Sequence, residues 1–412
     1  MEVMLKNLFA SKVAKQTLFL FVAQIFGMVV GFVSNMLLAK QMGATNFGIY
    51  SLSLTIITFI SIFFEFGYFS SASKMLANNH DINLEKKIFG TSIIIACILS
   101  AFFIVFALVI SFLLEKIFSD EIGQIIRISS FISWSFVIPF FMELILKGSN
   151  HIGYLAGFNI FSKILFVVFL SLLFIFERLT PLNALLSFSL SYAVTFAIYA
   201  YMLRPNFSGF FEILRAINSE NKRYGKYIYK GRIFAVSAYN IDRLLIGYFI
   251  GSKDVGFYGL ANSMATPIIS MSAAIGSSVF KTLTNSSKIP FTILKANLAW
   301  VLLSFFLTNT LGYLIINFYL KEEYDDVLFL LLLTSAGYCV KALYQPYNAW
   351  IVGQGYGKED QKMSYGMAGI NLLGNIIFVP MLGVIGAALS SILASFYYLY
   401  ASVYFVKRVS NG

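Results

Sequence analysis

The stretch GATNFGIY at residues 43–50 returns as GSKDVGFY at residues 251–258. Both copies hold two glycines five residues apart and a tyrosine two residues further on. These are Gly43, Gly48 and Tyr50 in the first copy, and Gly251, Gly256 and Tyr258 in the second. The copies are 208 residues apart in a chain of 412. This spacing predicts a tandem duplication.

The composition is that of a membrane protein. Hydrophobic residues make up 58% of the chain, aromatic residues 17% and charged residues only 12%, and the mean hydropathy is +0.79. A water-soluble globule of this length would not tolerate so apolar a surface, so the chain belongs in a bilayer.

The repeat extends beyond the glycine motif. The further matches keep the same order: Pro139 with Pro346 and Gly148 with Gly355 at an offset of 207, then Gly157 and Asn159 with Gly369 and Asn371 at an offset of 212. The drift in offset predicts a small insertion. So long a period excludes solenoid repeats. Two tandem halves in a membrane chain are typical of secondary transporters, with a substrate path between the halves.

Runs of about 20 apolar residues predict an all-α integral membrane protein with about twelve transmembrane helices. The predicted spans are 16–39, 44–66, 88–114, 125–147, 152–176, 181–203, 228–250, 255–280, 291–318, 325–350, 362–382 and 384–406.

The basic residues predict the orientation of these spans. If the N-terminus is inside and basic residues near span ends are counted with the adjoining connector, 21 of the 30 Lys and Arg residues lie on the cytoplasmic side, six lie outside and three lie deep within spans. Basic residues concentrate in cytoplasmic connectors, so both termini are predicted to be cytoplasmic. Membrane topology also explains the net charge of +11 without a nucleic-acid partner.

The longest basic connector lies where a duplicated chain should be joined. We expect an N-terminal bundle at 1–203, a cytoplasmic linker at 204–227 and a C-terminal bundle at 228–412. The linker region is predicted to hold a short interfacial helix whose apolar face consists of Phe207, Phe210, Phe211, Leu214 and Ile217. Its basic residues would contact anionic lipid headgroups, although topology control explains them equally well.

Charged residues within spans are the candidate functional residues, because each costs roughly 2.5 to 3.5 kcal/mol near the bilayer centre on insertion scales. Lys163, Lys341 and Arg243 are candidates for an electropositive cavity. The planar fork of an arginine suits a diphosphate, whereas lysines act as point charges. A purely structural charge network is the alternative.

Acidic residues within spans are candidates for cation coupling, and these are Asp242 and Glu65. Asp242 and Arg243 are adjacent, hence about 100° apart around a helix, so we expect one to pair with another helix while the other faces a cavity. Glu65 is equally suited to a position at the headgroups. Glu143 and Lys147 are expected to neutralise each other at i,i+4 spacing.

Prolines within spans predict kinks at Pro139, Pro346, Pro267 and Pro380. The repeat-related Pro139 and Pro346 are candidate bending points, with static packing as the alternative. Cys97 and Cys339 have no metal-type spacing, so we expect neither a metal site nor a cofactor. Nucleotide-binding and hydrolase motifs are lacking in the sequence, which predicts that the protein is not an enzyme.

Three stretches resemble the polysaccharide transporter family, which includes O-antigen and capsule repeat-unit flippases of the multidrug/oligosaccharidyl-lipid/polysaccharide exporter superfamily. They are LLAKQMGATNFGIYSLSLTII at 37–57, NIDRLLIGYFIGSKDVGFYGLANSMATP at 240–267 and NLLGNIIFVPMLGVIGAALSSILASFYY at 371–398. The matching motif positions are Asp242, Arg243, Asn371, Asn375, Pro380, Gly383 and Gly386.

The resemblance implies two pseudo-symmetric six-helix bundles around a central cationic cavity. It also implies alternating-access transport of undecaprenyl-diphosphate-linked oligosaccharides across the bacterial cytoplasmic membrane, in lipopolysaccharide or capsule assembly. Other polysaccharide-assembly membrane proteins are candidate partners. One alternative is a cation-coupled multidrug exporter of the same fold. A membrane polysaccharide polymerase or ligase is more remote, because the chain lacks the large external loop such enzymes usually need.

Overall fold

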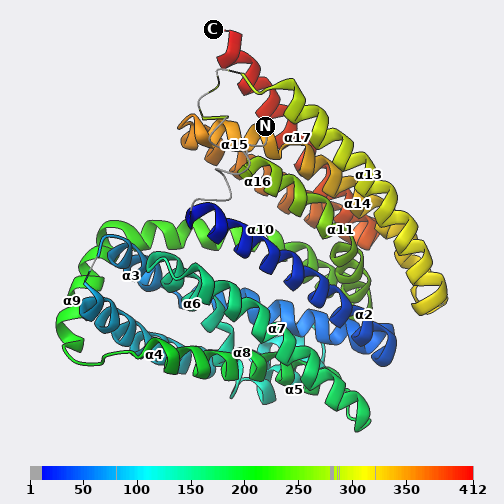
Figure 1. Ribbon diagram of the computed structural model, residues 1–412. Coiled ribbons are helices and arrows are strands. Elements are labelled where there is room, and N and C mark those ends of the chain that lie inside the picture. The colour runs from blue at the N-terminus through cyan, green and yellow to red at the C-terminus, as the bar shows by residue number, and fades with distance from the viewer. Residues whose placement is uncertain are drawn as a thin grey trace. The chain divides into compact units, whose positions relative to one another are not determined.

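The computed structural model describes residues 12–79, 81–278, 283–284, 286, 288–320 and 322–411. They form helices joined by turns, with no β-strand in these ranges (Figure 1). The chain divides into two compact units. Unit 1 comprises Met1–Ser34 and Ser53–Ser237, and unit 2 comprises Asn35–Leu52 and Ala238–Gly412. Residues 35–52 thus belong to unit 2, although the chain on both sides of them belongs to unit 1.

Every predicted span overlaps a helix. The helices from the first half of the chain are α2 (Lys12–Ser61), α3 (Tyr68–Ala77), α4 (Ile82–Ile117), α5 (Asp120–Ser129), α6 (Ile138–Gly148), α7 (Ile152–Ile175), α8 (Pro181–Leu203) and α9 (Phe210–Glu220). Those from the second half are α10 (Lys226–Phe249), α11 (Ser252–Ser278), α13 (Phe291–Ile315), α14 (Asp326–Leu343), α15 (Gln345–Gly353), α16 (Gly357–Leu382) and α17 (Val384–Asn411).

The membrane character of the fold agrees with the sequence analysis. Within the described ranges, eight helical segments are long and apolar enough to cross a membrane, or nine if the bent pair Asp120–Ser129 and Ser133–Gly148 is one span. The all-α fold is therefore confirmed, while the count of twelve stays a prediction. The first two predicted spans both lie in α2, which consists of two helices separated by non-helical backbone at Gly43 (φ 74°, ψ 169°). This backbone conformation favours glycine, because glycine has no Cβ atom to clash with the backbone.

Side-chain caps fix where three helices of unit 1 begin. The Asp81 carboxylate accepts a hydrogen bond of 2.8 Å from the Asn83 N–H at the start of α4. Ser119 caps α5 and Thr180 caps α8 in the same way. Short polar residues at these positions satisfy backbone donors that the first helical turn leaves unpaired, and so define the ends of the apolar helices.

Unit 1 is packed around aromatic side chains. The Phe141 ring of α6 lies 5.2 Å from the Phe69 ring of α3 and 5.9 Å from the Phe89 ring of α4, between centroids. These contacts bury large apolar surfaces, the main favourable contribution to packing. They hold α3, α4 and α6 together.

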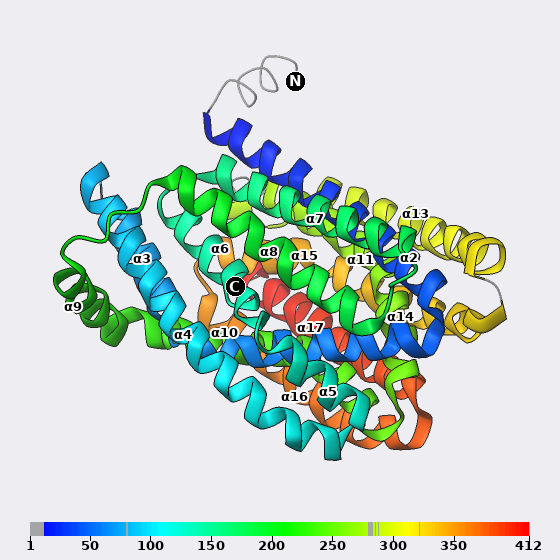
Figure 2. The same ribbon diagram turned by 90° about the horizontal axis from the view of Figure 1, so that it is seen from below.

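The helix α9 lies beside α3 and α4 within unit 1 (Figure 2). Its buried side chains are Ile213 and Ile217, four residues apart on one face. Phe211 is 72% exposed and points away from that face. Ile217 of the predicted apolar face thus lies on the protein side, while Phe207 and Phe211 are exposed. The interfacial placement of this helix stays a prediction.

Unit 2 has its own core, formed where α11, α13 and α14 meet, with α16 and α17 side by side next to α14 (Figure 1). Ala265, Ile268, Val301 and Ala342 form its buried cluster. Helices α11, α14, α16 and α17 also carry residues of the cavity described below.

Pro139 and Pro346 occupy equivalent places in the two halves. Each lies in the first turn of a short helix that follows a break, α6 and α15 respectively. Pro139 lies within the second segment of the bent pair, Ser133–Gly148, and the bend of 86° precedes that segment. At the break before α15, Pro346 has no N–H for the carbonyl of Ala342, four residues earlier, and the Asn297 side chain donates to that carbonyl at 3.0 Å. A side chain on α13 thus replaces the hydrogen bond that proline removes.

Candidate functional site

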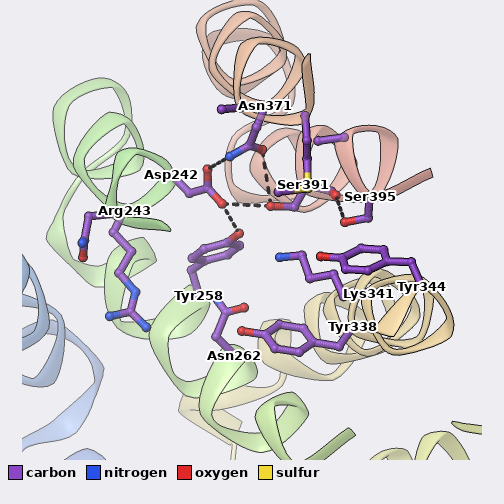
Figure 3. A pocket seen from close by; sticks show the side chains of 14 residues that line it. Asp242, Arg243, Tyr258, Asn262, Tyr338, Lys341, Tyr344, Asn371, Ser391 and Ser395 are labelled. Atoms are coloured by element: carbon purple, nitrogen blue, oxygen red, sulfur yellow. Dashed lines mark hydrogen bonds between the residues drawn. The ribbon is translucent and has the colours of Figure 1, made fainter. Parts of the chain in front are cut away.

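A cavity of about 260 Å³ lies within unit 2. Its walls come from α10, α11, α14, α16 and α17 (Figure 3). The charged and aromatic residues that line it are Asp242, Arg243, Lys341, Tyr258, Tyr338 and Tyr344. It brings a buried acid, two cations and three tyrosines to one place.

Asp242 is at the centre of a polar network. The residue is 6% exposed. Its Oδ2 accepts hydrogen bonds from the Tyr258 hydroxyl at 2.8 Å and the Ser391 hydroxyl at 2.9 Å. Its Oδ1 accepts from the side-chain amides of Asn371 and Asn375, both at 2.8 Å. These four neutral donors compensate the loss of water around a buried carboxylate.

The two asparagines reach Asp242 because they lie four residues apart on α16 and so share one helical face. The Asn375 amide also donates to the Asn371 carbonyl at 2.8 Å. With Asp242 on α10, Tyr258 on α11 and Ser391 on α17, the carboxylate joins four helices. Removal of its charge would affect helix packing as well as chemistry.

One oxygen in this network has no partner. Asn375 is fully buried, and its Oδ1 has no hydrogen-bond donor among the described residues. A carboxylate and amide oxygens are ligands that hard cations prefer. The arrangement can therefore accept a small cation after a modest rearrangement of the donors.

Arg243 and Lys341 carry positive charge to the same cavity. In the part of the chain that the structure describes, neither is within 4.0 Å of a carboxylate oxygen. Lys341 Nζ lies 5.0 Å from the Tyr338 ring centroid, a cation–π distance. In the view of Figure 3 the Tyr258 ring lies between the Arg243 and Lys341 side chains. Two cations without an acidic partner make this cavity suited to an anionic ligand.

Lys163, the third predicted cavity cation, belongs to unit 1. It lies on α7 against α2, and its Nζ is 2.5 Å from the position that a Cβ on Gly27 would occupy. The absence of a side chain at Gly27 makes room for this lysine. The structure brings Arg243 and Lys341 together, and it describes Lys163 separately from them.

Glu65, the second candidate for cation coupling, has partners of its own within unit 1. It is 2% exposed, and Ser70 donates to its Oε1 at 2.8 Å. Arg232 Nη1 lies 3.2 Å from its Oε2. The two atoms are not aligned as a hydrogen bond, and Oε2 has no hydrogen-bond donor among the described residues. The contact is an ion pair, so the charge of Glu65 is already balanced.

The pair of Glu143 and Lys147 is confirmed as an i,i+4 ion pair at 2.5 Å, half-exposed at the end of α6.

The glycine-motif residues have different environments. Gly43 interrupts α2, Gly48 contacts α11, and Tyr50 is buried. Tyr258, from the second copy, lines the cavity.

Several lining residues were not predicted from the sequence. Ser391, Ser395 and Asn262 lie within the family-like stretches, but they are common residue types in membrane helices and were not among the motif positions. Tyr338 gave a usable signal, because it precedes Lys341 by three residues and therefore shares its helical face.

The sequence matches the family described as polysaccharide biosynthesis protein over residues 13–286. No curated protein matches the chain significantly. Solved structures match it over most of its length at low sequence identity. The lipid II flippase MurJ in an inward closed conformation is 14% identical with a TM-score of 0.75, over 95% of this chain and 87% of that chain.

Two multidrug transporters are also similar. An inward-facing multidrug resistance MATE family transporter of the MOP superfamily is 16% identical, with a TM-score of 0.69 over 93% of this chain and 96% of that chain. The MATE multidrug transporter DinF-BH is 13% identical, with a TM-score of 0.62 over 96% of this chain and 94% of that chain. At these identities the likeness establishes the fold alone.

Proposed function

Because the chain belongs to the polysaccharide biosynthesis protein family, we propose that it is a flippase for undecaprenyl-diphosphate-linked oligosaccharide repeat units. It moves them across the bacterial cytoplasmic membrane by alternating access, driven by an ion gradient. Both termini lie in the cytoplasm, and the repeat units belong to a surface polysaccharide such as O-antigen or capsule. The named structural neighbours include a lipid flippase, which supports this substrate class.

The observation that carries the proposal is the cavity of unit 2, where Arg243 and Lys341 have no carboxylate partner among the described residues. A diphosphate carries the opposite charge, and the Arg243 guanidinium can bind it with two parallel hydrogen bonds. Lys341 adds a point charge next to an aromatic surface. Tyr338 and Tyr344 offer ring faces and hydroxyls to the first sugars. Lys163 in unit 1 is a further candidate to contact the diphosphate.

Ion coupling is assigned to Asp242. Its carboxylate lies in a cage of amides and hydroxyls, and the Oδ1 of Asn375 supplies a further ligand. A cation bound there reduces the negative charge beside Arg243, so its binding and release alter the affinity of the cavity for an anionic lipid. Glu65 is the less favourable coupling residue because Arg232 already balances its charge.

The test is to replace Arg243 and Lys341 together by alanine. Undecaprenyl-linked repeat units should accumulate and the surface polysaccharide should be lost, as in a strain that lacks the chain. The matched control replaces Glu143 and Lys147 by glutamine, which removes a half-exposed ion pair outside the cavity and should leave both pools unchanged. Normal surface polysaccharide in the double alanine variant would refute the role of the cavity.

The second candidate function is a cation-coupled multidrug exporter. Two observations favour it: the similarity to MATE transporters and the three tyrosines that line the cavity. Deletion of the chain would then change drug tolerance and leave the lipid-linked glycan pool unchanged. The two cations of the cavity argue against a cationic drug.

A further inference from the structure

Residues 35–52 are fastened to the rest of unit 2 by a small set of contacts, and they include the first copy of the glycine motif. Both ends of this segment continue into unit 1, at Ser34 and Ser53. Any movement between the units during transport must therefore act on it.

Two hydrogen bonds to backbone groups on either side of the break in α2 hold the segment in place. Where the helix restarts after Gly43, the Ala44 N–H donates a hydrogen bond of 2.8 Å to Glu323 Oε1. On the other side of the break, the Ala39 carbonyl accepts a hydrogen bond of 2.7 Å from the Tyr324 hydroxyl. Adjacent residues of one short turn (Glu322–Tyr324) thus cap both ends of the interrupted helix.

The chemistry of these two bonds suits a reversible fastening. Glu323 is exposed, so water can replace it at the Ala44 N–H, while its charge is favourable at the start of a helix. Tyr324 is buried, and this burial, with the neighbouring Glu323 carboxylate, raises the pKa of its hydroxyl. The hydroxyl therefore remains a donor at physiological pH.

The two copies of the glycine motif meet at the same segment. A methyl group at Gly48 would overlap the Ser252 carbonyl oxygen, and one at Gly256 would lie 2.9 Å from Gly48 Cα. The contact is backbone against backbone and requires glycine on both sides.

Two side-chain contacts add to this docking. Lys40 Nζ lies 3.8 Å from the Tyr319 ring centroid, and the Asn35 amide donates to the Ser263 hydroxyl at 3.0 Å. These polar and backbone contacts act beside apolar burial, because Leu38, Phe47 and Leu52 of the segment are also buried. They add the directional part of the docking, which a change at a single residue can remove.

We propose that residues 35–52 undock from the rest of unit 2 once in each transport cycle, and that Glu323 and Tyr324 form the latch that holds them docked. The role of this movement rests on the proposed alternating-access function. The Tyr324 ring lies 5.8 Å from the Phe257 ring, between centroids. Phe257 precedes Tyr258, which donates to Asp242, so the latch and the coupling acid contact the same turn of α11.

The first test measures undocking directly. Ser51 is buried and lies 3.9 Å from the position of a Cβ on Gly259. In the full chain with Cys97 and Cys339 replaced by serine, Ser51→Cys should react slowly with a small thiol reagent. Loss of one capping bond changes the ratio of docked to undocked protein by about 5- to 30-fold. Glu323→Ala and Tyr324→Phe should therefore each speed the reaction by that factor.

Asp325→Ala is the matched control, because it removes a carboxylate from the next turn that makes no capping bond. Its rate should equal that of the parent. If Glu323→Ala and Tyr324→Phe also react at the parent rate, the two residues are local caps and the latch is refuted. Tyr324→Phe keeps the ring and so remains informative if Glu323→Ala fails to fold.

The second test asks whether undocking is needed for transport. Asn35→Cys with Ser263→Cys places two thiols where side-chain atoms are now 3.0 Å apart. A short bis-methanethiosulfonate reagent should bridge them through two disulfide bonds, with methanesulfinate leaving at each, and stop transport, and reduction should restore it. Transport by the bridged protein would refute the proposal. If the Ser51→Cys rates respond to the latch but no lipid-linked glycan moves in the parent, the latch stands and the flippase function fails.

Discussion

The Tyr258 hydroxyl donates a hydrogen bond of 2.8 Å to Asp242 Oδ2. The two residues come from neighbouring helices, α11 and α10, and both line the cavity of unit 2. Tyr258 is also the tyrosine of the second glycine motif. The last residue of the motif that reveals the duplication therefore donates a hydrogen bond to the acid to which we assign ion coupling.

Tyr258→Phe should strengthen ion binding at Asp242. Without one of its four donors the carboxylate is less well stabilised and accepts a cation more readily. We expect the half-saturating ion concentration for transport to fall by about tenfold, which corresponds to about 1.4 kcal/mol. Tyr338→Phe is the control, since Tyr338 lines the same cavity. An equal shift in both variants would contradict this prediction.

Asp242→Asn and Asp242→Ala should separate coupling from packing. Both remove the charge, so transport should lose its dependence on the ion gradient. Asparagine keeps one acceptor oxygen, whereas alanine leaves the donors of α11, α16 and α17 unpaired, at about 1–3 kcal/mol for each buried group. Thermal unfolding in detergent should therefore show Asp242→Ala clearly below Asp242→Asn. Gradient-dependent transport by Asp242→Asn would argue against the assignment.

Asn297→Ala should destabilise the protein by about 1 kcal/mol, because it removes the side-chain donor to the Ala342 carbonyl, which then keeps only the Tyr344 N–H at the end of α14. Denaturant or thermal unfolding measures this loss. Asn317→Ala is the control: its exposed amide bonds only to Tyr313 O in the preceding turn, so we expect a change of at most about 0.5 kcal/mol. Equal effects of the two substitutions would mean that the proline break does not need Asn297.

Gly48→Ala should disrupt the docking of residues 35–52, because the added methyl group would overlap the Ser252 carbonyl. We expect faster modification of Ser51→Cys and a lower melting temperature. Gly31→Ala provides the comparison, since a Cβ there meets no atom within 4 Å. Alanine is the better helix former by about 1 kcal/mol, so Gly31→Ala should be neutral or stabilising. The prediction fails if Gly48→Ala is equally well tolerated.

The apolar runs and the spacing of the repeat were sufficient to predict the helices of the fold, because hydrophobic length and turn residues are local signals. The paired prolines were also visible, since each starts a new helix at the same place in its half. The break at Gly43 was visible as well, because the first two predicted spans are divided there and the structure has non-helical backbone at this residue. The capping of that break by Glu323 and Tyr324 was not, because these residues lie 279 and 285 positions along the chain from the groups that they cap.

Some features of the candidate site could be predicted and others could not. Asn371, Asn375 and Asp242 were found through the motifs and share one network, while Arg243 and Lys341 were found because charges are costly in a membrane. The pairing of Glu65 with Arg232 spans 167 residues, and no local pattern encodes it. Ser391 was missed because a serine in a membrane helix usually bonds to its own backbone.

The position of Lys163 against Gly27 gains meaning from the repeat. The offset of 212 that relates Asn159 to Asn371 also relates Lys163 to Asn375. The second half therefore has the Asn375 amide beside the Asp242 carboxylate, and the first half has the amine of Lys163 at the matching position. The ion coupling that we propose puts an exchangeable cation at Asp242, whereas the positive charge of a lysine is covalently attached. On that proposal, and if both halves descend from one gene, the duplication allowed one copy to keep an exchangeable ion and the other to replace it with a permanent one.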